Sequence, residues 1–219
     1  MAPDFEKFIR MSAHDPYSHT WRSIFYFNLP VGLLLCFIFH VIVRDDLVYN
    51  LPQFLSRRLS RFTQFNWVSY FSQNYLIVII SVLLGAASHI FWDSFTHRGG
   101  RAAGWLPFME NSLYISGDEL SAYYIMQRVS SLIGALVVLY AVLKLPAGPP
   151  LPHRKGILPF WLAVTVVATA AVGLKFWFGE YSPKDTIFIY IAAMLIGLIA
   201  APLILKKFRL HAYKAKPTE

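Results

Sequence analysis

Charged residues and cysteines are both scarce in this chain. Only 15% of its 219 residues are charged and 56% are hydrophobic, whereas soluble domains carry roughly 25% charge and about 45–50% apolar residues. The composition therefore excludes an ordinary soluble domain and indicates an integral membrane protein. The single cysteine, Cys36, excludes an internal disulfide, and its place within an apolar run indicates a small packing or lipid-facing residue.

Several functional signatures are also missing. The sequence contains no phosphate-binding glycine loop, no serine-nucleophile motif, no kinase signature and no nucleic-acid-binding motif. The first residues, Met1 to Lys7, lack the basic-then-apolar order of a cleavable signal peptide. The net charge of +8 comes mostly from loops and the tail, so it indicates membrane topology and contact with lipid headgroups rather than nucleic acid.

Five apolar stretches approach the roughly 20 residues that an α-helix needs to cross a bilayer. They run from Ile24 to Val43, Tyr75 to Phe95, Tyr124 to Leu143, Ile157 to Phe178 and Thr186 to Leu205. Because backbone polar groups in hydrocarbon must be satisfied within the segment, each stretch is expected to be helical. The sequence therefore predicts an all-α, polytopic membrane helix bundle that forms a single domain.

The connections divide this domain into parts. We expect a motif-bearing part (1–143), a stiff proline-rich linker (144–159), two generic crossings (160–205) and a basic tail (206–219). The connection from Arg44 to Asn74 holds arginines among aromatic residues, which fits either an amphipathic helix on the membrane surface or a solvated basic loop. The glycine-containing connection from Arg98 to Ala122 is expected to be irregular.

Lysine and arginine are unevenly shared between the two sides that five crossings create. The side with the Arg44–Asn74 connection, the linker and the tail carries more of them than the side with the N-terminus. The positive-inside rule therefore places the tail in the cytoplasm and the N-terminus outside.

A regular series of ionisable residues closes the second predicted crossing. His89, Asp93 and His97 follow one another at four-residue intervals, and each such step turns only about 40° around a helix axis. The three side chains are thus expected on one helical face, at the edge of the membrane. Ionisable groups in such positions are costly and usually functional.

The topology places further polar residues at the same end of the bundle. Asp4 and His19 precede the first crossing, and Gln127 and Arg128 open the third. Neutral histidine and carboxylate oxygen bind zinc and similar metals, and a pair four residues apart on a helix can chelate one ion. The pattern therefore favours a metal or acid–base site, for which Asp4 and His19 would complete the ligand set.

The spacing limits how the helical residues can share a metal. His89 and His97 would lie about 12 Å apart along the axis at 1.5 Å per residue, too far to bind one ion together. Either Asp93 bridges two metals, or one histidine binds metal while the other supports it or shuttles protons. Asp93 and His97 are then the candidate acid–base groups. The candidate substrate-binding residues are Arg98, Arg101, Gln127 and Arg128, whose arginines could hold an anionic group such as phosphate.

These motifs resemble a known family. The start Met1 to Glu6, the Ser18-His19-Thr20 triplet, the string from Gly85 to Gly100 and the segment from Gln127 to Gly134 are similar to an uncharacterised bacterial integral-membrane family with a domain of unknown function. That family is distantly similar to inner-membrane proteins described as metal-dependent hydrolases. Its members usually begin upstream of the Met-Ala-Pro-Asp sequence, so either a segment precedes Met1 or this chain lacks that segment.

The resemblance and the residue pattern together predict a metal-dependent hydrolase in the bacterial cytoplasmic membrane. The resemblance implies that Asp4, His19, His89, Asp93 and His97 form its site, with a divalent metal as cofactor: zinc first, manganese or iron as alternatives. The expected partners are membrane lipids and a lipid-linked or anionic ester or phosphoester, and no nucleic acid. A transporter that relays protons or ions and a non-catalytic membrane scaffold are the alternatives.

Overall fold

Five long helices dominate the structure. The computed structural model describes residues 2–63, 65–96, 106, 111–115, 118–149, 151 and 157–214. Within these residues, five helical segments are long and apolar enough to cross a membrane: Ile24–Asn50, Trp67–Thr96, Ala122–Lys144, Ile157–Phe178 and Pro183–Lys206. The prediction of an all-α membrane bundle with five crossings is confirmed.

The first span consists of four consecutive helical pieces. Two π-helical stretches, η1 (Ile24–Asn28) and η2 (Ile38–Val43), flank α2 (Leu29–Phe37), and α3 (Arg44–Asn50) ends the span. The helix thus continues past Val43, the predicted end. Hydropathy marks where the apolar side chains stop, but backbone hydrogen bonding continues through the charged residues that follow.

The connection between the first two spans is mostly helical. It holds α4 (Gln53–Leu59), the 3₁₀ turn η3 (Ser60–Phe62) and the first turns of α5 (Trp67–Thr96), which a kink at the non-helical residue Asn74 separates from the crossing predicted to start at Tyr75. The side chain of Asn66 accepts a hydrogen bond from the Ser69 N–H group at 3.0 Å, which satisfies one of the free donors in the first turn of α5. A solvated loop from Arg44 to Asn74 is therefore wrong, and the helical alternative describes most of this connection.

The remaining elements complete the bundle and its N-terminal end. They are α1 (Phe5–Arg10), the strands β1 (Ser112–Ile115) and β2 (Asp118–Ser121), α6 (Ala122–Lys144), α7 (Ile157–Phe178), the 3₁₀ turn η6 (Pro183–Asp185) and α8 (Thr186–Lys214). The two short strands pair antiparallel within the connection predicted to be irregular. Pro159 lies in the first turn of α7 rather than in the linker, because the first helical residues need no intrahelical N–H donor.

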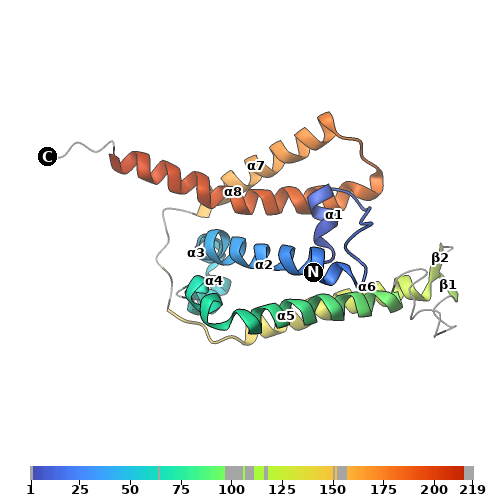
Figure 1. The fold of residues 1–219 in the computed structure, drawn as a ribbon. Coiled ribbons are helices and arrows are strands. Elements are labelled where there is room, and N and C mark those ends of the chain that lie inside the picture. The colour runs from blue at the N-terminus through green and yellow to red at the C-terminus, as the bar shows by residue number, and fades with distance from the viewer. Residues whose placement is uncertain are drawn as a thin grey trace.

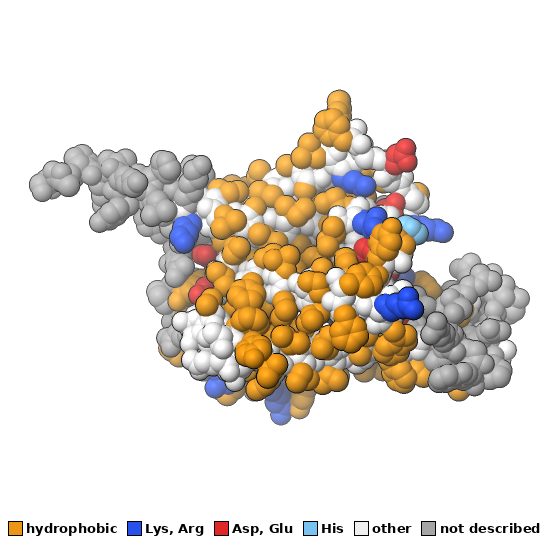
Figure 2. Space-filling view, in the orientation of Figure 1, with side chains coloured by type: hydrophobic (Ala, Val, Ile, Leu, Met, Phe, Trp, Pro, Cys, Tyr) orange, Lys and Arg blue, Asp and Glu red, His pale blue; other side chains and the backbone are white. Residues whose placement is uncertain are grey.

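The helices form two groups with the first span between them (Figure 1). α7 packs along α8 on one side, and α5 runs beside α6 on the other. α1, the β-ribbon and the turn between α7 and α8 lie at one end of the bundle, whereas α4 and the C-terminal end of α8 lie at the other. Apolar side chains cover much of the visible helical surface, as expected of helices that face lipid (Figure 2).

Close contacts fix the first span against α5. The Cα of Gly32 leaves room for Val82, whose Cγ1 atom would lie 2.7 Å from a Cβ atom at position 32. Towards the N-terminal end of the bundle, Ile24 of the first span packs against Ala86 and Ile90 of α5. This apolar contact aligns the start of the first span with the turn of α5 that carries His89.

We expect Gly197→Ala to destabilise the pair of helices α7 and α8. A Cβ atom at position 197 would lie 2.6 Å from the backbone oxygen of Val164, and overpacking of this kind costs about 1–3 kcal/mol. The measurement is the thermal unfolding midpoint in detergent. Gly173→Ala on α7 is the matched control, because among the described residues no atom beyond its own stretch of helix lies within 4 Å of the added Cβ. An unchanged midpoint for Gly197→Ala would contradict the close packing.

Candidate metal centre

Two separate parts of the chain meet at the N-terminal end of the bundle. Asp4 immediately precedes α1, and His19 lies in the turn that leads to the first span. His89 and Asp93 lie one turn apart on α5, near its C-terminal end. The topology therefore brings together four residues that the sequence predicts to share a site.

The imidazole and carboxylate groups of these residues are within contact distance. His89 Nε2 lies 3.0 Å from Asp4 Oδ2 and 3.2 Å from Asp93 Oδ2. His19 Nε2 lies 3.3 Å from Asp93 Oδ2 and 3.7 Å from Asp4 Oδ1. One ligand atom from each of Asp4, His19 and His89 lies within 4.8 Å of the other two. The predicted proximity of Asp4, His19, His89 and Asp93 is thus observed.

The two Nε2 atoms face the carboxylates of Asp4 and Asp93. Both are buried, and among the described residues neither has a partner with acceptable hydrogen-bond geometry. Their distances to the carboxylate oxygens resemble the separation between neighbouring ligands of a tetrahedral zinc ion, which is about 3.3 Å for bonds of about 2.0–2.1 Å. In the described structure, the same two carboxylates face both Nε2 atoms.

Asp4 does not serve as a conventional helix cap. It occupies the position before α1, where a side-chain oxygen often accepts a backbone hydrogen bond, but its carboxylate makes no such bond. Instead Asp4 Oδ1 lies 3.4 Å from Lys7 Nζ, and Oδ2 faces His89. Asp4 therefore does not cap α1 with its side chain, and its oxygens are turned towards the cluster.

A second group of side chains surrounds His19. Asp15 Oδ2 lies 2.5 Å from His19 Nδ1 and 3.3 Å from Lys7 Nζ, and Ser18 Oγ lies 3.0 Å from the same imidazole nitrogen. We did not predict Asp15 or Lys7 as site residues. The four-residue interval between Asp15 and His19 repeats that between His89 and Asp93, but it lies in a turn, where helical periodicity gives no expectation of contact.

The charged groups of the cluster shift one another's pKa values in the direction that favours their ionised forms. Burial acts to lower the pKa of His19, but the carboxylates of Asp15, Asp4 and Asp93 outweigh it and raise the pKa to about 11. Burial acts to raise the pKa of Asp4, yet His19, His89 and Lys7 hold it well below its usual range. The pKa of Asp15 is lowered in the same way, against burial, by His19 and Lys7. Without a bound cation, the cluster is an ion-pair network with a protonated His19 at neutral pH.

Buried polar side chains hold the N-terminal segment that delivers Asp4 and His19. Glu6, which is 2% exposed, accepts hydrogen bonds from the Tyr17 and Ser18 N–H groups at 3.0 and 2.7 Å. Asn28 Nδ2 donates to the Ser18 carbonyl oxygen at 3.0 Å. Asp185 at the start of the fifth span accepts from the Ala13 N–H group at 2.7 Å. These bonds tie the segment to itself, to the first span and to the fifth span.

We expect Glu6→Ala to lower the free energy of unfolding by about 1–3 kcal/mol, the cost of leaving the buried Ser18 N–H group unpaired. Ser18 is fully buried, so water cannot replace the lost carboxylate there. Denaturant unfolding in detergent measures the effect. Glu180→Ala is the control, because Glu180 is exposed at the same end of the bundle; equal effects of the two substitutions would contradict the bracing role of Glu6.

The chain was compared with known protein families, curated proteins and solved structures. Residues 1–209 match a family described as a domain of unknown function, DUF4184. The chain belongs to the DUF4184 family. No curated protein and no solved structure matches. The DUF4184 domain includes the N-terminal segment as well as all five spans, so the four clustered residues belong to one family domain.

The structure does not test the roles predicted for the other candidate site residues of this DUF4184 protein. His97, Arg98 and Arg101 lie outside the described residues. Arg128 is exposed on α6, donates a hydrogen bond to Tyr124 Oη at 2.8 Å and lies over its ring. Gln127 is half-buried one residue earlier. Substrate binding by these residues remains a prediction.

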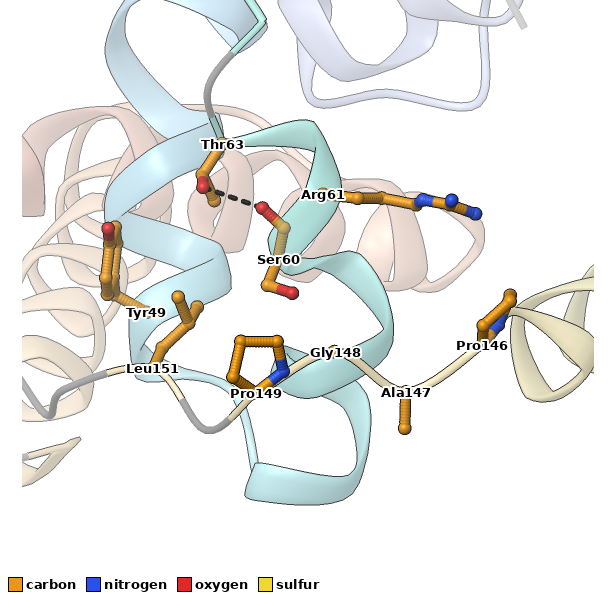
Figure 3. A pocket seen from close by; sticks show the side chains of 9 residues that line it. All are labelled: Tyr49, Ser60, Arg61, Thr63, Pro146, Ala147, Gly148, Pro149 and Leu151. Carbon is orange, nitrogen blue, oxygen red and sulfur yellow. Dashed lines mark hydrogen bonds between the residues drawn. The ribbon is translucent and has the colours of Figure 1, made fainter.

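A pocket of about 350 Å³ lies at the other end of the bundle (Figure 3). It is lined by Tyr49, Ser60, Arg61, Thr63, Pro146, Ala147, Gly148, Pro149 and Leu151. The Gly148 N–H group donates to the Arg57 carbonyl oxygen at 2.8 Å, which holds the linker against α4. The Arg61 side chain extends away from the pocket lining. None of the four clustered residues lines this pocket.

Proposed function

We propose that this protein is a membrane-embedded, metal-dependent hydrolase. The observation that carries the proposal is the convergence of His19 and His89 on the carboxylate of Asp4, with one ligand atom of each residue within 4.8 Å of the other two. Two imidazole nitrogens and a carboxylate oxygen form a ligand set that suits zinc, and also manganese or iron. Three protein ligands of this kind are typical of catalytic zinc sites, which keep one position open.

The residues around this ligand set have distinct proposed roles. A divalent metal, when bound, supplies a water of pKa near 7 and polarises an ester carbonyl or phosphoryl oxygen. Asp93 Oδ2 lies within 3.3 Å of both Nε2 atoms, so its carboxylate borders the ligand atoms. We assign Asp93 as the group that accepts a proton from the attacking water, because a general base must lie within hydrogen-bond reach of that proton.

The position of the cluster supports the choice of substrate. His19 precedes the first span, and His89 and Asp93 lie near the C-terminal end of the second, so we expect the cluster at the level of lipid headgroups. The proposed substrate is therefore an ester or phosphoester, lipid-linked or otherwise anionic. The excess of lysine and arginine on the opposite side supports placing the site at the outer face of a bacterial cytoplasmic membrane.

The proposal is tested by turnover of the full chain in detergent or lipid nanodiscs, loaded with zinc or manganese. The probes are p-nitrophenyl phosphate, bis(p-nitrophenyl) phosphate and p-nitrophenyl butyrate, which represent phosphomonoesters, phosphodiesters and carboxylic esters. We expect release of p-nitrophenol from at least one probe, loss on chelation and recovery when metal is restored. Stoichiometric metal binding without hydrolysis of any probe would contradict a hydrolase and leave only a metal site.

A further inference from the structure

We infer that Asp15 is a positioning residue that selects Nε2 of His19 as the metal-binding nitrogen. This inference rests on the proposed metal site. A histidine can bind metal through either ring nitrogen, and the hydrogen bond made by the other nitrogen decides which one is free. In His19 the other nitrogen, Nδ1, lies 2.5 Å from Asp15 Oδ2, while Nε2 faces Asp4 and Asp93.

Ser18 is the competitor for the same nitrogen. Its hydroxyl oxygen lies 3.0 Å from His19 Nδ1 and is able to donate or accept a hydrogen bond. If Ser18 donated to Nδ1 of a neutral imidazole, the proton would remain on Nε2 and block metal binding there. An ionised carboxylate only accepts, so Asp15 requires a proton on Nδ1 and leaves the Nε2 lone pair for the metal.

Asp15 is itself held in place but is separate from the proposed ligand set. Its Oδ2 atom lies 3.3 Å from Lys7 Nζ, and Lys7 also pairs with the ligand Asp4. The group of mutually close ligand atoms comprises Asp4, His19 and His89. Asp15 therefore acts on the metal only through His19, in the arrangement of a carboxylate that orients a metal-bound imidazole.

The test compares zinc affinity in the wild-type chain and in Asp15→Asn, by competition with a chromophoric chelator in detergent. The asparagine amide has an N–H group that can donate to His19 Nδ1. This favours the tautomer with its proton on Nε2, the nitrogen proposed to bind the metal. We expect zinc to bind about 10–100-fold more weakly, as for other groups that orient metal ligands. Asp45→Asn is the matched control, because Asp45 pairs with Arg44 near the other end of the first span.

A spectroscopic measurement separates orientation of His19 from general damage to the fold. The measurement is the ¹⁵N NMR spectrum of histidine-labelled, zinc-loaded wild-type protein, in which the His19 signals are assigned by comparison with His19→Gln. We expect the signals of a protonated Nδ1 and a metal-bound Nε2. Zinc bound through Nδ1 would overturn the inference, and this result does not depend on the folding of a variant.

The outcomes distinguish this inference from the proposed function. If wild-type protein binds no zinc, manganese or iron, the metal site itself fails. If it binds zinc normally and Asp15→Asn changes the affinity by less than twofold, the role of Asp15 fails while the metal site stands.

Discussion

Replacing His89 with alanine is expected to weaken zinc binding about a hundredfold to a thousandfold. Sites with four protein ligands bind zinc with about 10–16 kcal/mol, so one ligand contributes about 3 kcal/mol, and each 1.4 kcal/mol is tenfold in affinity. His89 Nε2 lies 3.0 Å from Asp4 Oδ2 and 3.2 Å from Asp93 Oδ2, so it is central to the proposed ligand set. Elemental analysis after gel filtration and chelator competition measure the effect.

The control for this substitution is His14→Ala. His14 is an exposed histidine of the same N-terminal segment, so its loss tests for non-specific binding of metal to surface imidazoles. Thermal unfolding of both variants without metal shows whether the fold is preserved. Retention of stoichiometric zinc by a folded His89→Ala variant would remove His89 from the ligand set.

Asp93→Asn is expected to reduce turnover by about 10²–10⁴-fold while leaving zinc bound, the range attributed to a positioned general acid or base. Asparagine keeps the size of the side chain but cannot accept the proton of the attacking water. The rate of hydrolysis of the best probe, measured with metal content on the same sample, checks both parts of the expectation.

Asp45→Asn again provides a matched control, since it makes the same chemical change far from the cluster in sequence. Loss of zinc together with activity in Asp93→Asn would show that Asp93 is a ligand and would contradict its assignment as the base. Unchanged turnover with zinc in place would exclude Asp93 from the chemistry.

Hydropathy was sufficient to predict the five spans and both ends of the fourth, Ile157 and Phe178, but not the end of the first. The apolar run of the first crossing stops at Val43, yet the helix continues to Asn50. α5 begins at Trp67, but a kink at the non-helical residue Asn74 lies just before the predicted start at Tyr75. Charged and polar residues at a membrane edge can remain helical because their backbone hydrogen bonds do not depend on side-chain polarity. The length of an apolar run therefore gives only a minimum length for the helix.

The candidate site could be predicted only where a regular helix or the topology fixes positions. The interval between His89 and Asp93 places both on one helical face, and the number of crossings places Asp4 and His19 at the same end. The contact of Asp15 with His19 depends instead on a turn held by Glu6. Contacts of this kind follow from the folding of the whole N-terminal segment, which no local pattern in the sequence describes.

X-ray absorption spectroscopy of the full chain loaded with one equivalent of zinc tests the central claim most directly. The account predicts a first shell of nitrogen and oxygen atoms at about 2.0–2.1 Å, with outer-shell scattering from two imidazole rings, those of His19 and His89. Substitution of either histidine should remove the scattering of one ring. A zinc shell without imidazole scattering, or a protein that retains no zinc, would contradict the metal centre and leave the cluster as an ion-pair network.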